Sequence, residues 1–417
     1  MKKSALIIFL FFFPLLMFAQ RLQENFPVAG SETKHFVRTW GEGYYDSQDI
    51  TNTFSSKFFG GGFIDSTLKN DIYNQLKDEN RIGAEISYGI QSFHFTTSFF
   101  GRPHWGWAFG ASHHEYYNAL FSKNLFGLTF FGNSMFAGDT ISLDPFEANQ
   151  LRFNKFQFGI FNKENFSRVM LSVLSAESFF EMKINSAQLY TEASGNELAL
   201  SLSENMSRSD TGSTGWGSYN GMGAAIDFVI HLNSGKNRSA LFSNGFSISV
   251  ENLGFLRWNE NTLHQQSDSS YYYEGFEVEN ILDENNSVYT GQSVNDTVSI
   301  SYTRTAKTTP LPFTFSFSKT IDRFSESKIQ SFYGLRMRAF CNYKPMIFAG
   351  VAFIPSQKFT VSPYVSFGGY GSFKAGLQAE ASLTKYFRLA VSSTNLVGNI
   401  SKNGYGKDLA VTLYSMF

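Results

Sequence analysis

The chain has 417 residues, with 34 Lys plus Arg against 35 Asp plus Glu, so its formal net charge is −1. Phosphate binding needs an excess of basic residues, and this balance therefore argues against a nucleic-acid-binding protein. Charged residues make up only 17% of the chain and aromatic residues also 17%, a combination that is unusual for a soluble domain.

The first element in the chain is predicted to be an export signal over residues 1–19. Two lysines near the start precede an apolar run over 5–16, and Ala19 and Gln20 flank the expected cleavage site. The run is shorter than the ~20 residues that a membrane-spanning helix needs, so export is favoured over an N-terminal anchor. The mature chain, residues 20–417, is expected to form one domain.

Beyond the signal, apolar residues alternate with small or polar ones, which is typical of β-strands. Phe156 and Phe158, for example, stand on either side of Gln157. The candidate strands in chain order are 81–89, 91–100, 105–112, 151–161, 167–175, 179–190, 196–204, 220–232, 244–252, 297–304, 312–319, 330–341, 346–354, 359–367, 374–383, 386–394 and 408–417. Some of these are expected to extend beyond a membrane, so the pattern predicts a ring of about 14 strands, with roughly 12 to 16 allowed.

Two segments are predicted to be short helices. Residues 65–79 begin with Asp65 as a candidate N-cap and space apolar residues four apart, and residues 115–125 form the second. The first helix could plug a lumen, lie at the periplasmic rim or lie solvated between strands. The polar stretches 205–220 and 259–296 are predicted to be long outward-facing loops, the expected surface for an external ligand or partner.

Two architectures fit the alternating strands. In a soluble sandwich the apolar faces meet in a core, whereas in a transmembrane antiparallel β-barrel they meet lipid and the polar faces line the lumen. Aromatic residues near segment ends and segments of roughly ten residues favour the barrel. Outer-membrane barrels typically end in an aromatic residue with apolar residues at alternate positions before it. Phe417, Leu413, Val411 and Leu409 resemble this insertion signal, and Ser415 departs from it.

Three further motifs resemble one family. A glycine-rich strand ends near Asp227 and is followed by the pattern Ser-x-x-Asn-x-Gly-x-x-x-Trp over 249–258, and segments 128–138 and 403–406 carry matching positions. The chain is similar over most of its mature length to uncharacterised outer-membrane barrels of Bacteroidota, of the domain of unknown function 5723 type. The resemblance implies an outer-membrane barrel and no assigned activity. A looser likeness, in size and strand number alone, is to fatty-acid-transporter barrels of about fourteen strands.

Few residues have the spacing that catalysis or metal binding requires. His113 and His114 lie near His104, but adjacent residues of a strand point to opposite faces, so no metal site is predicted. No Gly-x-Ser-x-Gly elbow occurs, although a barrel hydrolase could still hold a Ser–His pair distant in sequence. Cys341 is the only cysteine and is predicted to be a packed, unreactive thiol. The sequence therefore predicts no catalytic residue, no cofactor and no enzyme activity.

Arg336 and Arg338 share the polar face of their segment and are the candidate luminal residues. They would tune ion selectivity or pair with luminal acids and fill the interior. The expected function is a pore or transporter for a small solute, a hydrophobic one included, and the alternative is a structural or docking barrel of a secretion or cell-surface assembly. Expected partners are outer-membrane lipid, the barrel-insertion machinery and a small-molecule solute. The expected location is the outer membrane.

Overall fold

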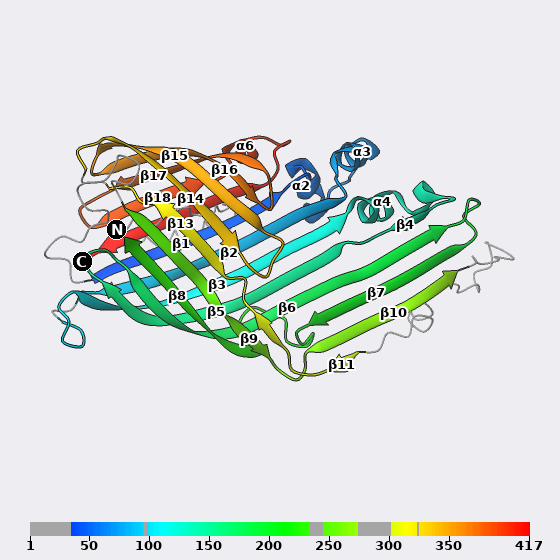
Figure 1. The fold of residues 1–417 in the computed structure, drawn as a ribbon, viewed down its shortest axis with the longest axis horizontal. Helices are drawn as coiled ribbons and strands as arrows, with labels where there is room; N and C mark the ends of the chain where they lie inside the picture. Colours follow the sequence, from blue (N-terminus) through cyan, green and yellow to red (C-terminus); the bar gives the residue numbers. More distant parts are fainter. Residues whose placement is uncertain (1–34, 96–97, 233–244, 274–301, 323–324) are drawn as a thin grey trace, which may run out of the picture.

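The computed structural model describes residues 35–95, 98–232, 245–273, 302–322 and 325–417. Fourteen of the strands in these ranges pair antiparallel into one closed ring (Figure 1). In the order of the ring they are β1 (His35–Ser47), β2 (Glu79–His94), β3 (Trp105–Ser122), β5 (Phe146–Asn162), β6 (Arg168–Thr191), β8 (Gly221–Leu232), β9 (Phe246–Trp258), β13 (Thr314–Lys319), β14 (Ile329–Arg338), β15 (Lys344–Ser356), β16 (Phe359–Gly369), β17 (Phe373–Ser382), β18 (Phe387–Ser393) and β19 (Lys407–Met416). The predicted barrel of about 14 strands is confirmed.

The ring closes where the first and last strands of the barrel pair. β1 and β19 are antiparallel from Phe36 opposite Met416 to Tyr45 opposite Lys407. Beyond that ladder, the backbone N–H of Phe417 donates to the carbonyl of His35 at 2.9 Å, and the reverse bond is 3.0 Å long. Phe417 therefore belongs to the seam, and closure leaves the ring without an unpaired edge.

Apolar side chains cover the outer face of the barrel wall, whereas the inner face carries most of the charged and polar side chains together with buried apolar clusters. On β5, Phe156 and Phe158 are 57% and 55% exposed, whereas Lys155 and Gln157 are buried on the inner face. On β6, Leu171 and Val173 are more than 60% exposed. A water-soluble sandwich has the opposite polarity, so the arrangement matches the barrel alternative.

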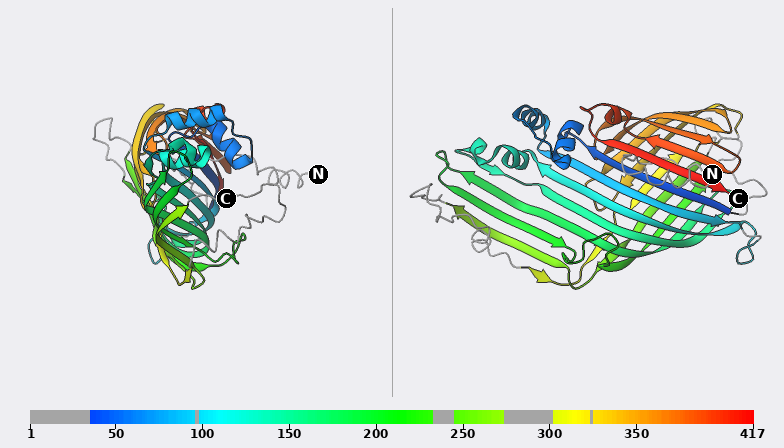
Figure 2. Two further views of the ribbon diagram at one scale, coloured as in Figure 1. Left: turned by 90° about the vertical axis from the view of Figure 1, so that its right-hand side faces the viewer. Right: turned by 180° about the vertical axis from the view of Figure 1, so that it is seen from behind.

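Beyond the ring, the strands β3, β5 and β6 continue into a projecting sheet (Figures 1 and 2). The first part of β6, 168–176, pairs with β8, and its second part, 180–191, pairs with β7 (Leu198–Arg208), which in turn pairs with β10 (Leu263–Tyr273). Two short strands join this sheet: β4 (Thr140–Ser142) pairs with β6, and β11 (Thr303–Arg304) pairs with β10. A third short strand, β12 (Thr308–Pro310), pairs with the barrel strand β9. The loop predicted over 205–220 thus starts only after Arg208. The loop predicted over 259–296 contains β10, and its residues 274–296 lie outside the described ranges.

Short helices gather at the end of the barrel remote from the C-terminal Phe417 (Figure 2). They are α2 (Asn52–Gly60), α3 (Ser66–Gln75), α4 (Lys123–Phe131) with the 3-10 turn η1 (Asn133–Phe136), and α6 (Leu396–Ile400). The helices α2, α3 and α4 share a core formed by Ile50, Phe54, Ile72, Leu76 and Phe126. Among the described residues no helix is long and apolar enough to cross a membrane.

The helix predicted over 65–79 forms as α3 but ends at Gln75, and Glu79 already belongs to β2. Asp65 caps α3 by accepting from the backbone N–H of Leu68 at 2.9 Å. The helix lies at the rim and not inside the barrel (Figure 1). The helix predicted over 115–125 is wrong, because β3 continues to Ser122 and α4 begins only at Lys123. The cause is tertiary: β2 and β5 supply ladder partners along β3 up to its end.

Candidate functional site

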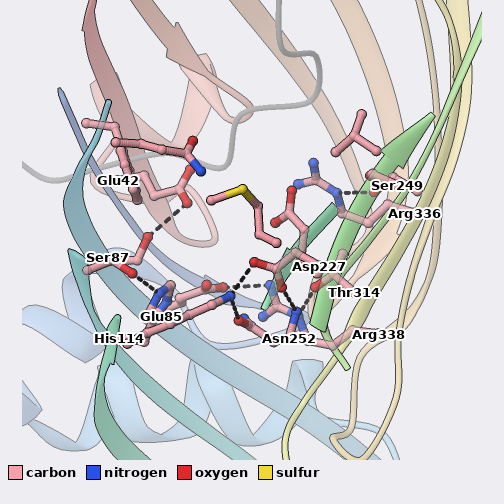
Figure 3. A pocket seen from close by; sticks show the side chains of 18 of the residues that line it. Glu42, Glu85, Ser87, His114, Asp227, Ser249, Asn252, Thr314, Arg336 and Arg338 are labelled. Atoms are coloured by element: carbon pink, nitrogen blue, oxygen red, sulfur yellow. Dashed lines mark hydrogen bonds and ion pairs between the residues drawn. The ribbon is translucent and has the colours of Figure 1, made fainter. Parts of the chain in front are cut away.

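The inner faces of the strands enclose a charged cavity of about 140 Å³. Nine charged residues from seven strands of the barrel line it: Arg38, Lys155, Arg168, Arg336 and Arg338 against Glu42, Glu85, Asp227 and Glu251. Both predicted luminal residues, Arg336 and Arg338, therefore reach the lumen (Figure 3). The two signs nearly cancel, so the cavity is polar without a strong field of either sign.

Arg338, the last residue of β14, has partners on all sides. Its Nη2 lies 2.7 Å from Oε2 of Glu85 on β2, and the two side chains are only 6% and 9% exposed. Its Nη1 donates to the hydroxyl of Tyr44 at 2.9 Å, and its guanidinium stands over the ring of Tyr116 at 5.3 Å. An ion pair with this burial and these added contacts holds both side chains across the lumen.

Arg336 lies two residues earlier on the same face of β14. Its Nε donates to the hydroxyl of Ser316 on β13 at 3.3 Å. The register of the two strands places Arg336 opposite Ser316 and Arg338 opposite Thr314. The period of two along β14 thus explains why both arginines point inward, at successive levels of the lumen.

A second network joins β5, β8 and β9. Nζ of Lys155 lies 2.6 Å from Oδ2 of Asp227 and 2.6 Å from Oδ1 of Asn252. The backbone N–H of Asn252 donates to Asp227 at 2.6 Å, and the side-chain amide of Asn252 donates to the hydroxyl of Tyr116 at 3.0 Å. Gln157 also bonds Asp227. These contacts satisfy a lysine and a carboxylate that the wall would otherwise bury unpaired.

The backbone explains how this network forms. Between the pairs Ile226–Leu253 and Phe228–Val250, β9 has one residue more than β8, so Glu251 and Asn252 form a β-bulge opposite Asp227. Asn252 has φ +63°, the left-handed conformation that asparagine tolerates better than most residues. A β-bulge re-aims the residues of its strand locally, and here it directs the backbone N–H of Asn252 toward Asp227.

The three histidines considered as metal ligands do not converge. His114 bonds Ser112 at 2.9 Å beside the luminal cavity, whereas His113 bonds Glu115 at 3.0 Å. His104 lies at the other end of β3, 2.8 Å from Glu164. Within the part of the chain that the structure describes, no group of three His, Cys, Asp or Glu side chains is placed to hold a metal ion.

Above the luminal cavity, on the side of the projecting sheet, lies a wider hollow of about 590 Å³, here called the vestibule. It is lined by β3, β5 and β6, by residues 307–312 and by residues 340–342. Tyr116 lines both the vestibule and the luminal cavity. The two hollows therefore meet at Tyr116, directly beside Arg338.

Other predicted residues are placed as follows. Phe417 lies at the barrel seam, and Ala19 and Gln20 lie outside the described residues. Cys341 is half-buried in the turn after β14, and burial raises the pKa of its thiol. Sequence reasoning missed Glu85, Tyr116 and Lys155 as site residues, because their partners are far away in the chain. Asp227 and Asn252 were noticed only as parts of a motif.

The fold and the site define a closed antiparallel β-barrel with a polar, nearly charge-balanced lumen. Residues 42–390 match the model of a family of unknown function, DUF5723, and the chain belongs to that family. A comparison with curated proteins finds no match.

Among solved structures, the chain is similar to the toluene transporter TodX of P. putida, with 8% identity, 93% of this chain and 91% of that chain covered, and a TM-score of 0.33. It is also similar to the translocator domain of the autotransporter NalP from Neisseria meningitidis, with 7% identity, 94% and 91% covered, and a TM-score of 0.28. A mutant of Rh. blastica porin has 10% identity, 92% and 100% covered, and a TM-score of 0.25. These likenesses are too low to carry an argument, so the barrel assignment rests on the strand pairing itself.

Proposed function

We propose that this protein is an outer-membrane channel for a small polar solute, closed in the conformation described here. The outer wall supports the membrane location, because exposed apolar side chains such as Phe156 and Leu171 cover strands whose inner faces carry charge. Long connections project from the end of the barrel remote from Phe417, which in such barrels is the extracellular side. Cleavage between Ala19 and Gln20, and insertion by barrel-insertion machinery through the end at Phe417, belong to this proposal.

The observation that carries the channel proposal is the meeting of the vestibule and the luminal cavity at Tyr116. Arg338 and Glu85 close the lumen at this level, because their ion pair spans from β14 to β2. Movement of the arginine or of the Tyr116 ring would join a hollow of about 590 Å³ to one of about 140 Å³. Arg338 thus acts as a closing element, whereas the near balance of luminal charge argues against strong ion selectivity.

The experiment is single-channel recording in planar lipid bilayers. The natural protein is expected to insert and stay mostly silent, and Tyr116→Ala is expected to give stepwise openings. Tyr364→Ala is the matched control, because Tyr364 is also a buried barrel tyrosine but lines neither hollow. Silence of folded, inserted Tyr116→Ala would refute the channel.

A second candidate, a docking barrel of a cell-surface assembly, is favoured by the projecting sheet. β6 runs for 24 residues, and β7 and β10 lie wholly outside the ring. Silence of Tyr116→Ala together with a partner protein that co-purifies from native membranes, and is lost when 198–208 is replaced by a short turn, would favour this candidate.

A further inference from the structure

The vestibule has the composition of a binding site for an uncharged solute. Its charged residues form two neutral pairs: Lys183 lies 2.7 Å from Glu147, and Lys307 lies 2.7 Å from Glu181. A hollow whose charges are paired in this way has little attraction for an ion of either sign. Its volume of about 590 Å³ lies within the ~300–1,000 Å³ of small-molecule sites.

Side-chain amides gather on one wall of the vestibule. Asn118 on β3 faces Asn149 on β5 directly across the ladder, and Asn342 approaches from the turn after β14. The amide nitrogens of Asn149 and Asn342 both point at Oδ1 of Asn118, each at 3.4 Å. Bonds this long are weak, so a ligand could replace them at small cost. Amides donate and accept hydrogen bonds, which matches the dual character of hydroxyl groups.

An aromatic side chain stands beside these amides in an unusual conformation. Phe340 is 63% exposed and has φ +57°, a left-handed backbone conformation that is strained for an aromatic residue. Its ring touches only one other aromatic ring among the described residues, that of Phe313 at 5.9 Å. Strain of this kind persists where the surrounding structure holds it, and it often marks a ligand site.

We propose that the vestibule binds a neutral, hydroxyl-rich solute of the mono- or disaccharide class. Hydroxyl groups replace the long bonds among Asn118, Asn149 and Asn342, and the C–H face of a sugar ring packs on the exposed face of Phe340. This inference deepens the proposed channel by naming the solute class. It therefore rests on that function, although binding itself requires no transport.

The natural protein contains a reporter for this site, because its single cysteine, Cys341, lines the vestibule. Burial raises the pKa of the Cys341 thiol, so labelling with bimane maleimide is best done at mildly alkaline pH. The purified protein is kept in a detergent without a sugar headgroup, since a maltoside would compete. Glucose, maltose and sucrose are titrated as probes, with glucuronate and glucosamine as charged counterparts.

Saturable fluorescence changes are expected with a neutral sugar, and at least tenfold weaker responses are expected with both charged sugars. Asn118→Ala and Phe340→Ala should each weaken the apparent affinity about tenfold or more. Gln188→Ala is the control, because Gln188 lies further along β6 and lines neither hollow. Isothermal titration of the unlabelled protein checks that the dye does not create the site.

The inference is overturned if no neutral sugar saturates, if charged sugars bind equally well, or if Asn118→Ala binds as the natural protein does. The channel proposal and the sugar-binding proposal can be refuted independently. Openings by Tyr116→Ala without sugar binding would leave the channel and remove this inference. Sugar binding with a silent Tyr116→Ala would keep the site and remove the channel.

Discussion

Separating Glu85 from Arg338 is expected to destabilise the barrel and to open it. Two unit charges 2.7 Å apart attract by roughly 6 kcal/mol at an effective dielectric constant of about 20. Desolvation offsets much of this attraction, whereas removal of one partner leaves a buried charge, at a cost of about 3–5 kcal/mol. Glu85→Gln and Arg338→Met should each lower the free energy of unfolding by that amount. The double variant should lose less than the sum, with a coupling of about 2 kcal/mol.

The assay is urea unfolding of the barrel in lipid vesicles, followed by tryptophan fluorescence, with planar-bilayer conductance measured on the same preparations. The control cycle is Asp46→Asn and Lys374→Met. This pair is ion-paired and as deeply buried as Glu85 and Arg338, but it lines neither hollow. It should cost a similar free energy without opening the lumen.

Two results would contradict this reasoning. Additive single-variant losses would mean that Glu85 and Arg338 do not interact appreciably, whatever their distance. A folded double variant as silent as the natural protein would mean that the pair does not close the lumen. Openings in the Asp46 and Lys374 cycle would show that conductance reports general loosening of the barrel.

Three smaller predictions test the rest of the fold. Gly254→Ala should lower the folded fraction, because its Cβ would lie 2.1 Å from a backbone oxygen of β8, whereas Gly60→Ala should not, because there is open space around Gly60. The folded fraction is measured as the difference in gel mobility between unheated and heated samples. Asn52→Asp should lower the free energy of unfolding in urea by about 1–3 kcal/mol, because a carboxylate cannot donate to the carbonyls of Gly398 and Gly406 that the Asn52 amide contacts. An unchanged free energy of unfolding would contradict this role of the Asn52 amide. The backbone N–H of Leu68, and then a lysine, hold the pKa of Asp65 below its ordinary 3.8. The Asp65 carboxylate therefore stabilises α3 fully above pH 3.8, and this stabilisation is lost as the pH falls through the lower folded-state pKa. The helical circular dichroism signal should decline over this pH range in the natural protein and not in Asp65→Asn.

The barrel could be predicted because its signal is local. Alternation with period two requires only neighbouring residues, and along β5 it separates exposed Phe156 and Phe158 from buried Lys155 and Gln157. The first barrel strand, β1, was missed because it lacks this local signal. Its sequence mixes Arg38 and Glu42 with glycines, so it has no continuous apolar face, and only its pairing with β2 and β19 defines it as a strand.

The division of β6 into two predicted strands, 167–175 and 179–190, has a different cause. Glu177 is an extra residue in the ladder: Phe153 pairs with Ala176 and Arg152 with Ser178. One extra residue reverses the phase of alternation, and in a sequence such a reversal is indistinguishable from the end of one strand and the start of another. The structure instead holds Glu177 fully buried beside Arg152, 2.8 Å away.

The same distinction between local and distant signals separates the site residues that could be predicted from those that could not. Arg336 and Arg338 stand out because a short alternating segment carries two positive charges on one face. The closure that Arg338 makes depends on Glu85, which lies on a different strand, β2, 253 positions earlier in the chain. A carboxylate on a polar strand face gives no signal of its own.

The motif formed by Asp227 and residues 249–258 is best explained by its structural role in the barrel wall. Asp227 lies opposite the β-bulge of β9 and accepts from the backbone N–H of Asn252, whose left-handed conformation suits asparagine. Gly254 permits the close approach of β8, and Trp258 is buried against Phe179 with ring centroids 4.4 Å apart. Asp227, Asn252, Gly254 and Trp258 thus each have a structural role that needs no substrate. A solute should therefore be recognised elsewhere in the barrel. The vestibule is lined by residues outside this motif, and we expect solute specificity to be determined there.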